Sequence, residues 1–157
     1  IVYHSEIMTT TEGKNPVMLV LLDDQRERYA DERIRDSLTV DLAKARQKNI
    51  PVLIFQHVAL YTGDSSVTST PSYYDSGSAP NTRLPGNPNS DALTKEIHKL
   101  ITDNADIVAG VFCGHEHVNV YTEIIGTGEN GTGHVIPQNY LNTNQTGSGT
   151  VLKISVK

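Results

Sequence analysis

Apolar residues along the chain occur either in continuous runs or at helical spacing. The runs at 17–22, 50–55 and 106–113 are typical of strands that are buried on both faces of a sheet. Apolar residues recur every three or four positions at 31–48 and 91–103, which predicts two amphipathic helices. Strands that alternate with helices in this order predict an α/β fold, whose parallel strands are joined by right-handed crossovers.

Segments outside this central pattern are expected to add further strands. Residues 1–8 are predicted to form one strand, and residues 118–125 alternate between apolar and polar as an antiparallel strand does. The glycines at 126–133 predict a turn, and the alternation at 150–157 predicts a closing strand. We therefore expect a mixed sheet within an α/β sandwich.

Residues 62–90 show no apolar periodicity and consist mainly of Ser, Thr, Gly, Pro, Asn and Asp. We interpret them as a long loop inserted in a single domain that spans residues 1–157. Loops of this length are uncommon in compact domains and are often functional. Ser90, at the end of the loop, is the expected N-cap of the second helix.

The composition limits the classes of protein to which the chain belongs. Hydrophobic residues make up 37% and charged residues 20% of the chain, which is typical of a globular domain with a buried core. A net charge of -5 without a lysine or arginine cluster argues against binding to a nucleic-acid backbone. No apolar run approaches the roughly 18 residues that span a membrane. The single cysteine excludes an internal disulfide.

Two of the predicted buried strands end in a histidine. His57 follows the strand at 50–55, and His115 follows the strand at 106–113. Ligand sites of open α/β sheets gather at the carboxyl ends of the strands, so both imidazoles are expected at the same edge. Imidazole nitrogens bind zinc, iron, nickel and copper, which makes the pair a candidate metal site. Gly114 is expected to leave room for a group that binds beside the backbone.

The spacing of His115 and His117 adds to this hypothesis. In an extended segment, residues two apart lie on the same face, about 6.5 Å apart. This is too far for easy chelation of one ion but suits two ions about 3.5–4 Å apart. Glu116 would point away from the ions and could orient one of their ligands.

Ordinary structural roles compete with these interpretations. Histidines are frequent in loops, and a single His-x-His pattern is weak evidence for a site. Cys113 is expected to be a small core residue, and His98 a solvated residue at the flank of its helix. Asp23 and Asp24 are either ligands or part of the turn that ends their strand.

Four stretches of the sequence together resemble one protein family. The stretch DIVAGVFCGHEHVN resembles the final conserved block of the calcineurin-like metallophosphoesterases, a family that includes the purple acid phosphatases. Its hallmark is G-H-x-H at the end of an apolar strand, often followed by an asparagine such as Asn119. IPVLIFQHVALY resembles the preceding histidine block, NPVMLVLLDD the strand before it, and LTVDLAKARQKN the intervening helix. The resemblance covers most of the chain in the family's order.

The resemblance implies the C-terminal half of a mixed-sheet αββα sandwich that hydrolyses phosphate esters, as a phosphatase or a phosphodiesterase. One metal ion would bind His57 and His115, and a second ion would bind His117. In the complete domain the two ions would be divalent or trivalent, and iron, zinc and manganese are the candidates. Glu116 and Asn119 would lie behind the ligands.

The long loop would form the rim of this site. Arg83 would contact the phosphate of the ester, and Tyr73 or Tyr74 would contact the leaving group. An ordinary loop role for these three side chains is the alternative interpretation.

The chain departs from the family because its earlier ligand blocks are absent. No D-x-H, G-D-x-x-D or G-N-H precedes His57, and Val58 and Ala59 stand where the family often has proline. Since Ile1 is not an initiator methionine, we expect the N-terminal half of the domain to precede it. A secreted or periplasmic location stays open if a signal sequence was removed. Three neutral imidazoles cannot balance two cations, so we expect this chain alone to bind one ion or none and to be inactive or nearly so.

Two other interpretations are open. The chain could be a non-catalytic binding or assembly module derived from the phosphoesterase fold. Alternatively, two copies could pair as a homo-oligomer through strand edges expected at 1–8 and 17–22. Ligand blocks upstream of Ile1 would favour the enzyme over the module.

Overall fold

The computed structural model describes residues 3–9, 12–24, 28–29, 31–63, 84–115 and 119–141. These residues form six strands and three helices, which confirms the prediction of an α/β fold. In chain order the elements are β1 (Tyr3–Met8), β2 (Val17–Leu22), α1 (Glu32–Lys48), β3 (Val52–Gln56), α2 (Ala92–Thr102), β4 (Val108–Cys113), β5 (Val120–Ile125), α3 (Gly128–Gly131) and β6 (Val135–Tyr140). The closing strand expected at 150–157 lies outside the described residues.

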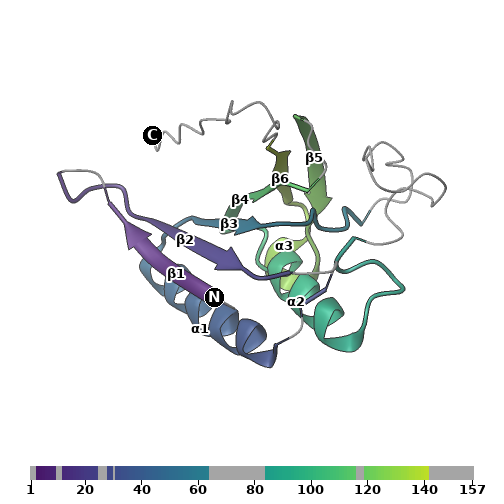
Figure 1. The fold of residues 1–157 in the computed structure, drawn as a ribbon. Coiled ribbons are helices and arrows are strands. Elements are labelled where there is room, and N and C mark those ends of the chain that lie inside the picture. Colours follow the sequence, from purple (N-terminus) through teal and green to yellow (C-terminus); the bar gives the residue numbers. More distant parts are fainter. Residues whose placement is uncertain are drawn as a thin grey trace.

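All six strands belong to one mixed sheet, in the order β1-β2-β3-β4-β6-β5 (Figure 1). Strands β2, β3, β4 and β6 run parallel to their neighbours in this series, and β1 and β5 are antiparallel strands at the two edges. Strand β6, which the sequence pattern did not predict, pairs with both β4 and β5. Two strand edges were expected to be available for pairing with a second copy. The expectation is wrong for β2, because β2 pairs with both β1 and β3.

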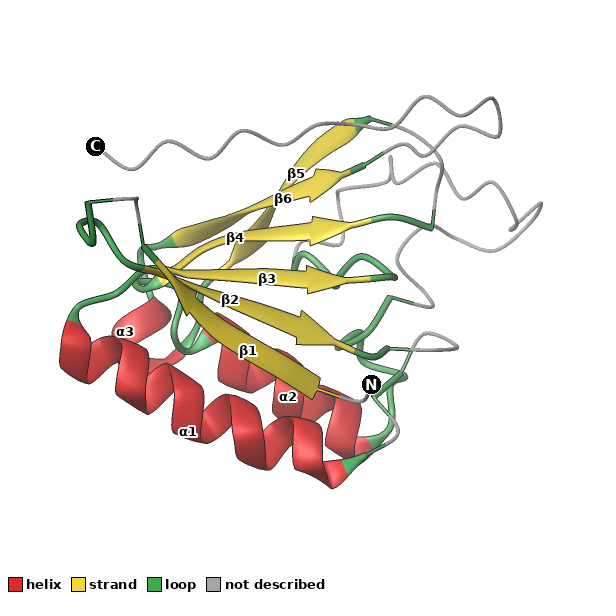
Figure 2. Ribbon diagram, turned by 60° about the vertical axis from the view of Figure 1, so that its left-hand side comes forward, coloured by secondary structure: helices red, strands yellow, loops and turns green. Residues whose placement is uncertain are grey.

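The three helices lie on the same face of the sheet (Figure 2). The residues of α1 that the helical spacing predicts to be buried are buried against the sheet, namely Ile34, Leu38, Leu42 and Ala45. Helix α2 buries Ile97 and Ile101 in the same core. No helix in the described residues is long and apolar enough to cross a membrane.

The local structure differs from the prediction at a helix cap and at a turn. Asp91, and not Ser90, is the N-cap of α2, and its side chain accepts a hydrogen bond from the Thr94 amide. The Ser90 hydroxyl instead accepts a bond from the Gly86 amide, which closes the turn before the helix. The glycine-rich segment expected to form a turn includes the one-turn helix α3.

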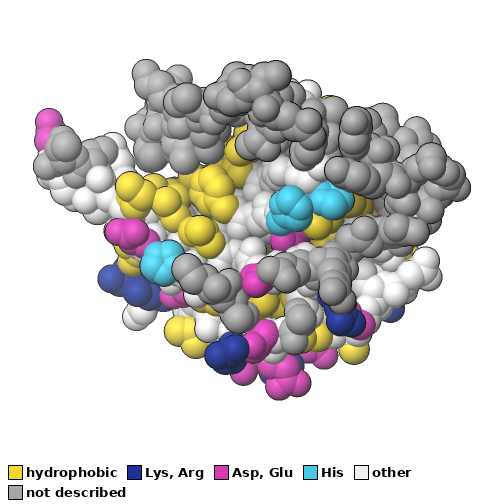
Figure 3. Space-filling model, viewed as in Figure 1, with side chains coloured by type: hydrophobic (Ala, Val, Ile, Leu, Met, Phe, Trp, Pro, Cys, Tyr) yellow, Lys and Arg dark blue, Asp and Glu magenta, His cyan; other side chains and the backbone are white. Residues whose placement is uncertain are grey.

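The second face of the sheet is also apolar. Alternation along β2 and β3 places Leu19, Leu21 and Phe55 opposite the residues that face the helices. Phe55 stacks on Phe112 of β4 with 5.0 Å between ring centroids, and Leu21 is 45% exposed. Among the described residues no helix lies on this face, where Figure 3 shows hydrophobic side chains gathered at the surface.

Candidate functional site

Two of the three predicted ligand histidines meet at the carboxyl edge of the sheet. Strands β3 and β4 are parallel neighbours in which Gln56 pairs with Cys113. The ladder continues for one step, since the Gly114 amide donates to the His57 carbonyl at 3.0 Å. His57 Nε2 lies 3.0 Å from His115 Nδ1, and the two rings are perpendicular with 4.9 Å between centroids. Two adjoining histidine side chains are visible at the surface in Figure 3.

The backbone of His115 adopts an unusual conformation. Its φ of 66° lies in the left-handed region, which costs a residue other than glycine about 1 kcal/mol. The other described non-glycine residues with positive φ are Asn15 and Asn49, a residue type that tolerates this region. Strained conformations of this kind gather at functional sites. Here the strained residue supplies one nitrogen of the histidine pair.

Asp24 is buried behind the histidine pair. Its Oδ1 accepts the backbone N–H of His57 at 2.8 Å, and its Oδ2 accepts that of Val58 at 2.7 Å. The side chain is only 1% exposed. Burial raises the pKa of this carboxyl to about 6, and the two hydrogen bonds oppose that shift. Asp24 therefore binds the turn that follows the neighbouring strand β3, with one backbone amide on each oxygen.

A second pair of buried polar side chains supports the same turn. Gln56 donates from Nε2 to the Val58 carbonyl, and its Oε1 accepts the hydroxyl of Tyr29 at 2.8 Å. The Tyr29 amide in turn donates to the Thr94 hydroxyl of α2 at 3.1 Å. The sequence analysis did not identify Gln56 or Tyr29. A polar residue at the end of an otherwise apolar strand was the available signal for Gln56.

The segment after His57 is fixed by Gln138 of β6. The Gln138 side chain is fully buried. Its Oε1 accepts the Leu60 amide at 2.7 Å, and its Nε2 donates to the Leu60 carbonyl at 3.0 Å and to the Thr122 hydroxyl at 3.1 Å. A small apolar cluster packs beneath the site and includes Val58 and Cys113. The expectation that Cys113 is a small core residue is confirmed, since it is 2% exposed.

Five of the predicted site residues lie outside the described residues, namely Tyr73, Tyr74, Arg83, Glu116 and His117.

Two more predictions concern the residues that flank the histidine motif. Asn119 is exposed and directly precedes β5. Within the described residues the surroundings of Gly114 are not crowded, and the expected room for a group bound beside its backbone stays a prediction. A Cβ built there would be 3.9 Å from His57 Nδ1, an ordinary contact.

His98 is not the solvated flank residue that the sequence suggested. Its Nε2 is 2.8 Å from the Tyr61 carbonyl, and the ring packs tightly beneath Gly86, whose added Cβ would be 2.1 Å from it. The Tyr61 amide also donates to the Pro85 carbonyl at 3.0 Å. His98 therefore joins the two described ends of the long loop to helix α2.

Acidification is expected to destabilise the fold through His98. Burial lowers the pKa of His98 in the folded protein below the ordinary value near 6.5. The unfolded chain then binds more protons, so the free energy of unfolding falls as the pH drops below about 6.5. Asp24 has the opposite effect, because its pKa is raised in the folded protein. Between its ordinary pKa and the folded value of about 6, the folded protein binds more protons at Asp24, which increases the free energy of unfolding as the pH falls. Denaturant unfolding of wild type and His98→Gln, each at pH 7 and pH 5, isolates the contribution of this histidine. Between these two pH values His98→Gln should lose less free energy of unfolding than wild type. An equal loss in both proteins would contradict the assignment.

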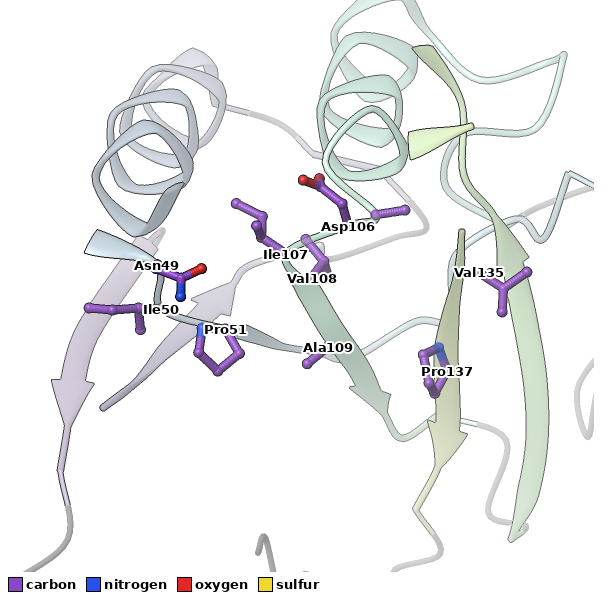
Figure 4. Close-up of a pocket in the computed structure, with 10 residues that line it drawn as sticks. Asn49, Ile50, Pro51, Asp106, Ile107, Val108, Ala109, Val135 and Pro137 are labelled. Atoms are coloured by element: carbon purple, nitrogen blue, oxygen red, sulfur yellow. The ribbon is translucent and has the colours of Figure 1, made fainter. Parts of the chain in front are cut away.

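A pocket lies at the opposite edge of the sheet, at the amino ends of β3, β4 and β6 (Figure 4). Its volume is about 450 Å³, and its lining includes Pro51, Ala109 and Pro137. Asp106 is the one ionisable residue among those that line it, and Arg46 binds both Asp106 oxygens at 2.6 and 2.8 Å. Among the described residues that line the pocket, the one ionisable side chain is thus held by an arginine, so the histidine edge is the better candidate.

The histidine pair fits two positions of a metal site but does not complete one. Two nitrogens bound at about 2.0–2.1 Å to one ion are about 2.9 Å apart at a right angle and about 3.3 Å apart in a tetrahedron. The observed 3.0 Å between His57 Nε2 and His115 Nδ1 falls in this range. The described residues contain no group of three or more histidine, cysteine, aspartate or glutamate side chains that could hold a metal ion. Further ligands would have to come from elsewhere.

No protein-family model matches the chain, and no curated protein matches it.

Proposed function

We propose that this chain is the C-terminal part of a metal-dependent phosphoester hydrolase and supplies His57 and His115 to one of two metal ions. The observation that carries the proposal is the 3.0 Å approach of the two imidazole nitrogens from neighbouring parallel strands. The order of the sequence blocks resembling calcineurin-like metallophosphoesterases supports the same function. His117 would serve the second ion.

The position of the pair supports a ligand site. Both histidines follow the carboxyl ends of parallel strands, where open α/β sheets place their ligands. The buried groups beneath them hold the backbone in place, and the imidazoles themselves are accessible, with His57 exposed and His115 half-buried. Such a site combines rigid support with access for a substrate.

The remaining ligands must carry negative charge. Imidazoles are neutral when they bind a metal, and a two-metal hydrolase needs carboxylates to offset the charge of its ions. The carboxylate of Asp24 binds the His57 backbone, and each of its oxygens accepts one backbone amide. The apolar second face of the sheet, with Leu21 and Phe55, suits a further layer of the sandwich. A polypeptide segment in that layer would bring the missing carboxylates.

The residues of this chain would have limited roles in the reaction. When bound, the two ions would lower the pKa of a water molecule and offset the charge of the phosphoryl oxygens. His57 and His115 would hold one ion at the edge of the sheet. Asp24 and Gln56 would keep the His57 turn in place without touching the substrate.

Metal content and hydrolysis, measured on the same samples, test this proposal. After dialysis the purified chain should retain one zinc, iron or manganese ion or none, by elemental analysis. In a titration it should bind one of these ions, and His57→Ala should bind it more weakly. Phosphomonoester and phosphodiester hydrolysis should stay near background for the chain alone. A complete two-ion centre with activity would contradict the half-site, and a chain with no affinity for any of these metals would contradict the metal function.

A non-catalytic binding module is the second candidate. It is favoured by the absence, among the described residues, of a third side chain able to bind the same ion. Sequence upstream of the chain separates the two functions, because D-x-H and G-N-H blocks there would supply the hydrolase with its carboxylate and remaining ligands. Their absence from the whole gene product would favour the module.

A further inference from the structure

The backbone that carries His57 is held by a carboxylate from the neighbouring strand. Strands β2 and β3 are parallel, and Leu21 pairs with Phe55 near their carboxyl ends. Asp24 extends from the end of β2 to the amides that follow β3. Each of its oxygens accepts one amide, His57 N at 2.8 Å and Val58 N at 2.7 Å. Two acceptors on one rigid carboxylate fix the direction of both N–H groups.

The same turn is fixed on its carbonyl side. Gln56 Nε2 donates to the Val58 carbonyl, and Tyr29 donates to Gln56 Oε1. The amide and the carbonyl of Val58 are thus both bound by buried side chains. Tyr29 is 1% exposed, so this arrangement is shielded from water. Hydrogen bonds shielded in this way resist competition by solvent and restrict local motion.

We infer that Asp24 is a positioning residue, whose carboxylate holds the His57 backbone so that Nε2 faces Nδ1 of His115. The effect of Asp24 on metal affinity rests on the proposed function, whereas its effect on the contact between the two histidine rings does not. The His57 ring contacts the ring of His115, with 3.0 Å between Nε2 and Nδ1, so a shift of the His57 backbone would change this contact. Ligands must be held within about 0.5 Å of the binding geometry, and small shifts of the turn would exceed that tolerance.

Asp24→Asn tests this inference with a side chain of nearly the same size. An amide can accept only one of the two N–H groups and turns its own NH₂ toward the other, so the turn must move. NOEs between the His57 and His115 rings in the metal-free protein should weaken or vanish. The Kd for Co²⁺ should rise by about tenfold, a typical effect of losing a group that orients a ligand. Asp36→Asn, which changes an exposed carboxylate on α1, is the control, and it should leave both measurements unchanged.

The two measurements separate the inference from the proposed function. Loss of the inter-ring NOEs in Asp24→Asn supports the positioning role even if wild type binds no Co²⁺, a result that would overturn the metal function alone. A folded Asp24→Asn that keeps the NOEs and a Kd within twofold of wild type would overturn the inference.

A milder variant covers the case in which Asp24→Asn fails to fold. Tyr29→Phe keeps the buried ring and removes only the hydroxyl that holds Gln56. It should weaken the inter-ring NOEs in the same direction while the far-UV circular dichroism stays unchanged. If Asp24→Asn does not fold and Tyr29→Phe leaves the ring contact intact, the buried side chains support the fold alone and the inference is wrong.

Discussion

His57→Ala and His115→Ala are each expected to lower the affinity of the chain for Co²⁺ or Zn²⁺ by on the order of a hundredfold. The physical reason is that the two nitrogens, 3.0 Å apart, bind one ion together. Once one imidazole holds the ion, the second meets it at a high effective concentration, and removing either one loses that advantage. A hundredfold change corresponds to about 2.7 kcal/mol of binding free energy.

Two exposed histidines elsewhere provide matched controls. His4 lies on the edge strand β1, and His134 directly precedes β6. His4→Ala and His134→Ala remove the same imidazole from the surface and should leave the Kd within twofold of wild type. Isothermal titration with Co²⁺, supported by its visible absorption, measures all four variants. Equal losses in the control and site variants would mean that the ion binds scattered surface histidines instead of the pair.

Gln138→Met is expected to lower the free energy of unfolding by about 3 kcal/mol. Methionine fills nearly the same volume but cannot bind the Leu60 amide and carbonyl, which Gln138 holds at 2.7 and 3.0 Å. A buried backbone group left without a partner costs about 1–3 kcal/mol, and here two are affected. The loss should appear as a lower midpoint in urea with an unchanged slope.

Thr122→Val is the control for this prediction. It removes one hydroxyl that contacts Gln138 Nε2 at 3.1 Å and leaves both Leu60 bonds in place. Its cost should stay near about 1 kcal/mol, the net value of one hydrogen bond. A loss below about 1 kcal/mol for Gln138→Met would show that water replaces the side chain at Leu60, and that the segment after His57 does not depend on β6.

Apolar periodicity predicted most elements that carry the site. The runs at β2, β3 and β4 and the buried positions of α1 follow from burial on one or both faces, which the sequence displays directly. Strand β6 escaped prediction because Pro137 and the buried Gln138 interrupt its alternation. Gln138 is buried because it satisfies the backbone of Leu60, and that partner lies 78 residues away in the sequence.

The candidate site was predictable to a similar degree. His57 and His115 follow strands of a parallel sheet, so their meeting at one edge could be expected from chain order. The sequence did not predict the left-handed backbone of His115 or the hydrogen bonds of Asp24 to two amides. Both depend on how the chain turns after a strand, which residue type alone does not determine. His98 was misassigned because the loop that covers it has no periodic pattern.

The most direct test of the central claim is a Zn²⁺ titration followed through the ring nitrogens in long-range ¹H–¹⁵N spectra. The signals of His57 Nε2 and His115 Nδ1 are expected to shift together and to saturate at one ion, while those of His4, His98 and His134 stay unchanged. Shifts confined to those other rings, or no shift in either His57 or His115, would contradict a metal site at the carboxyl edge of the sheet.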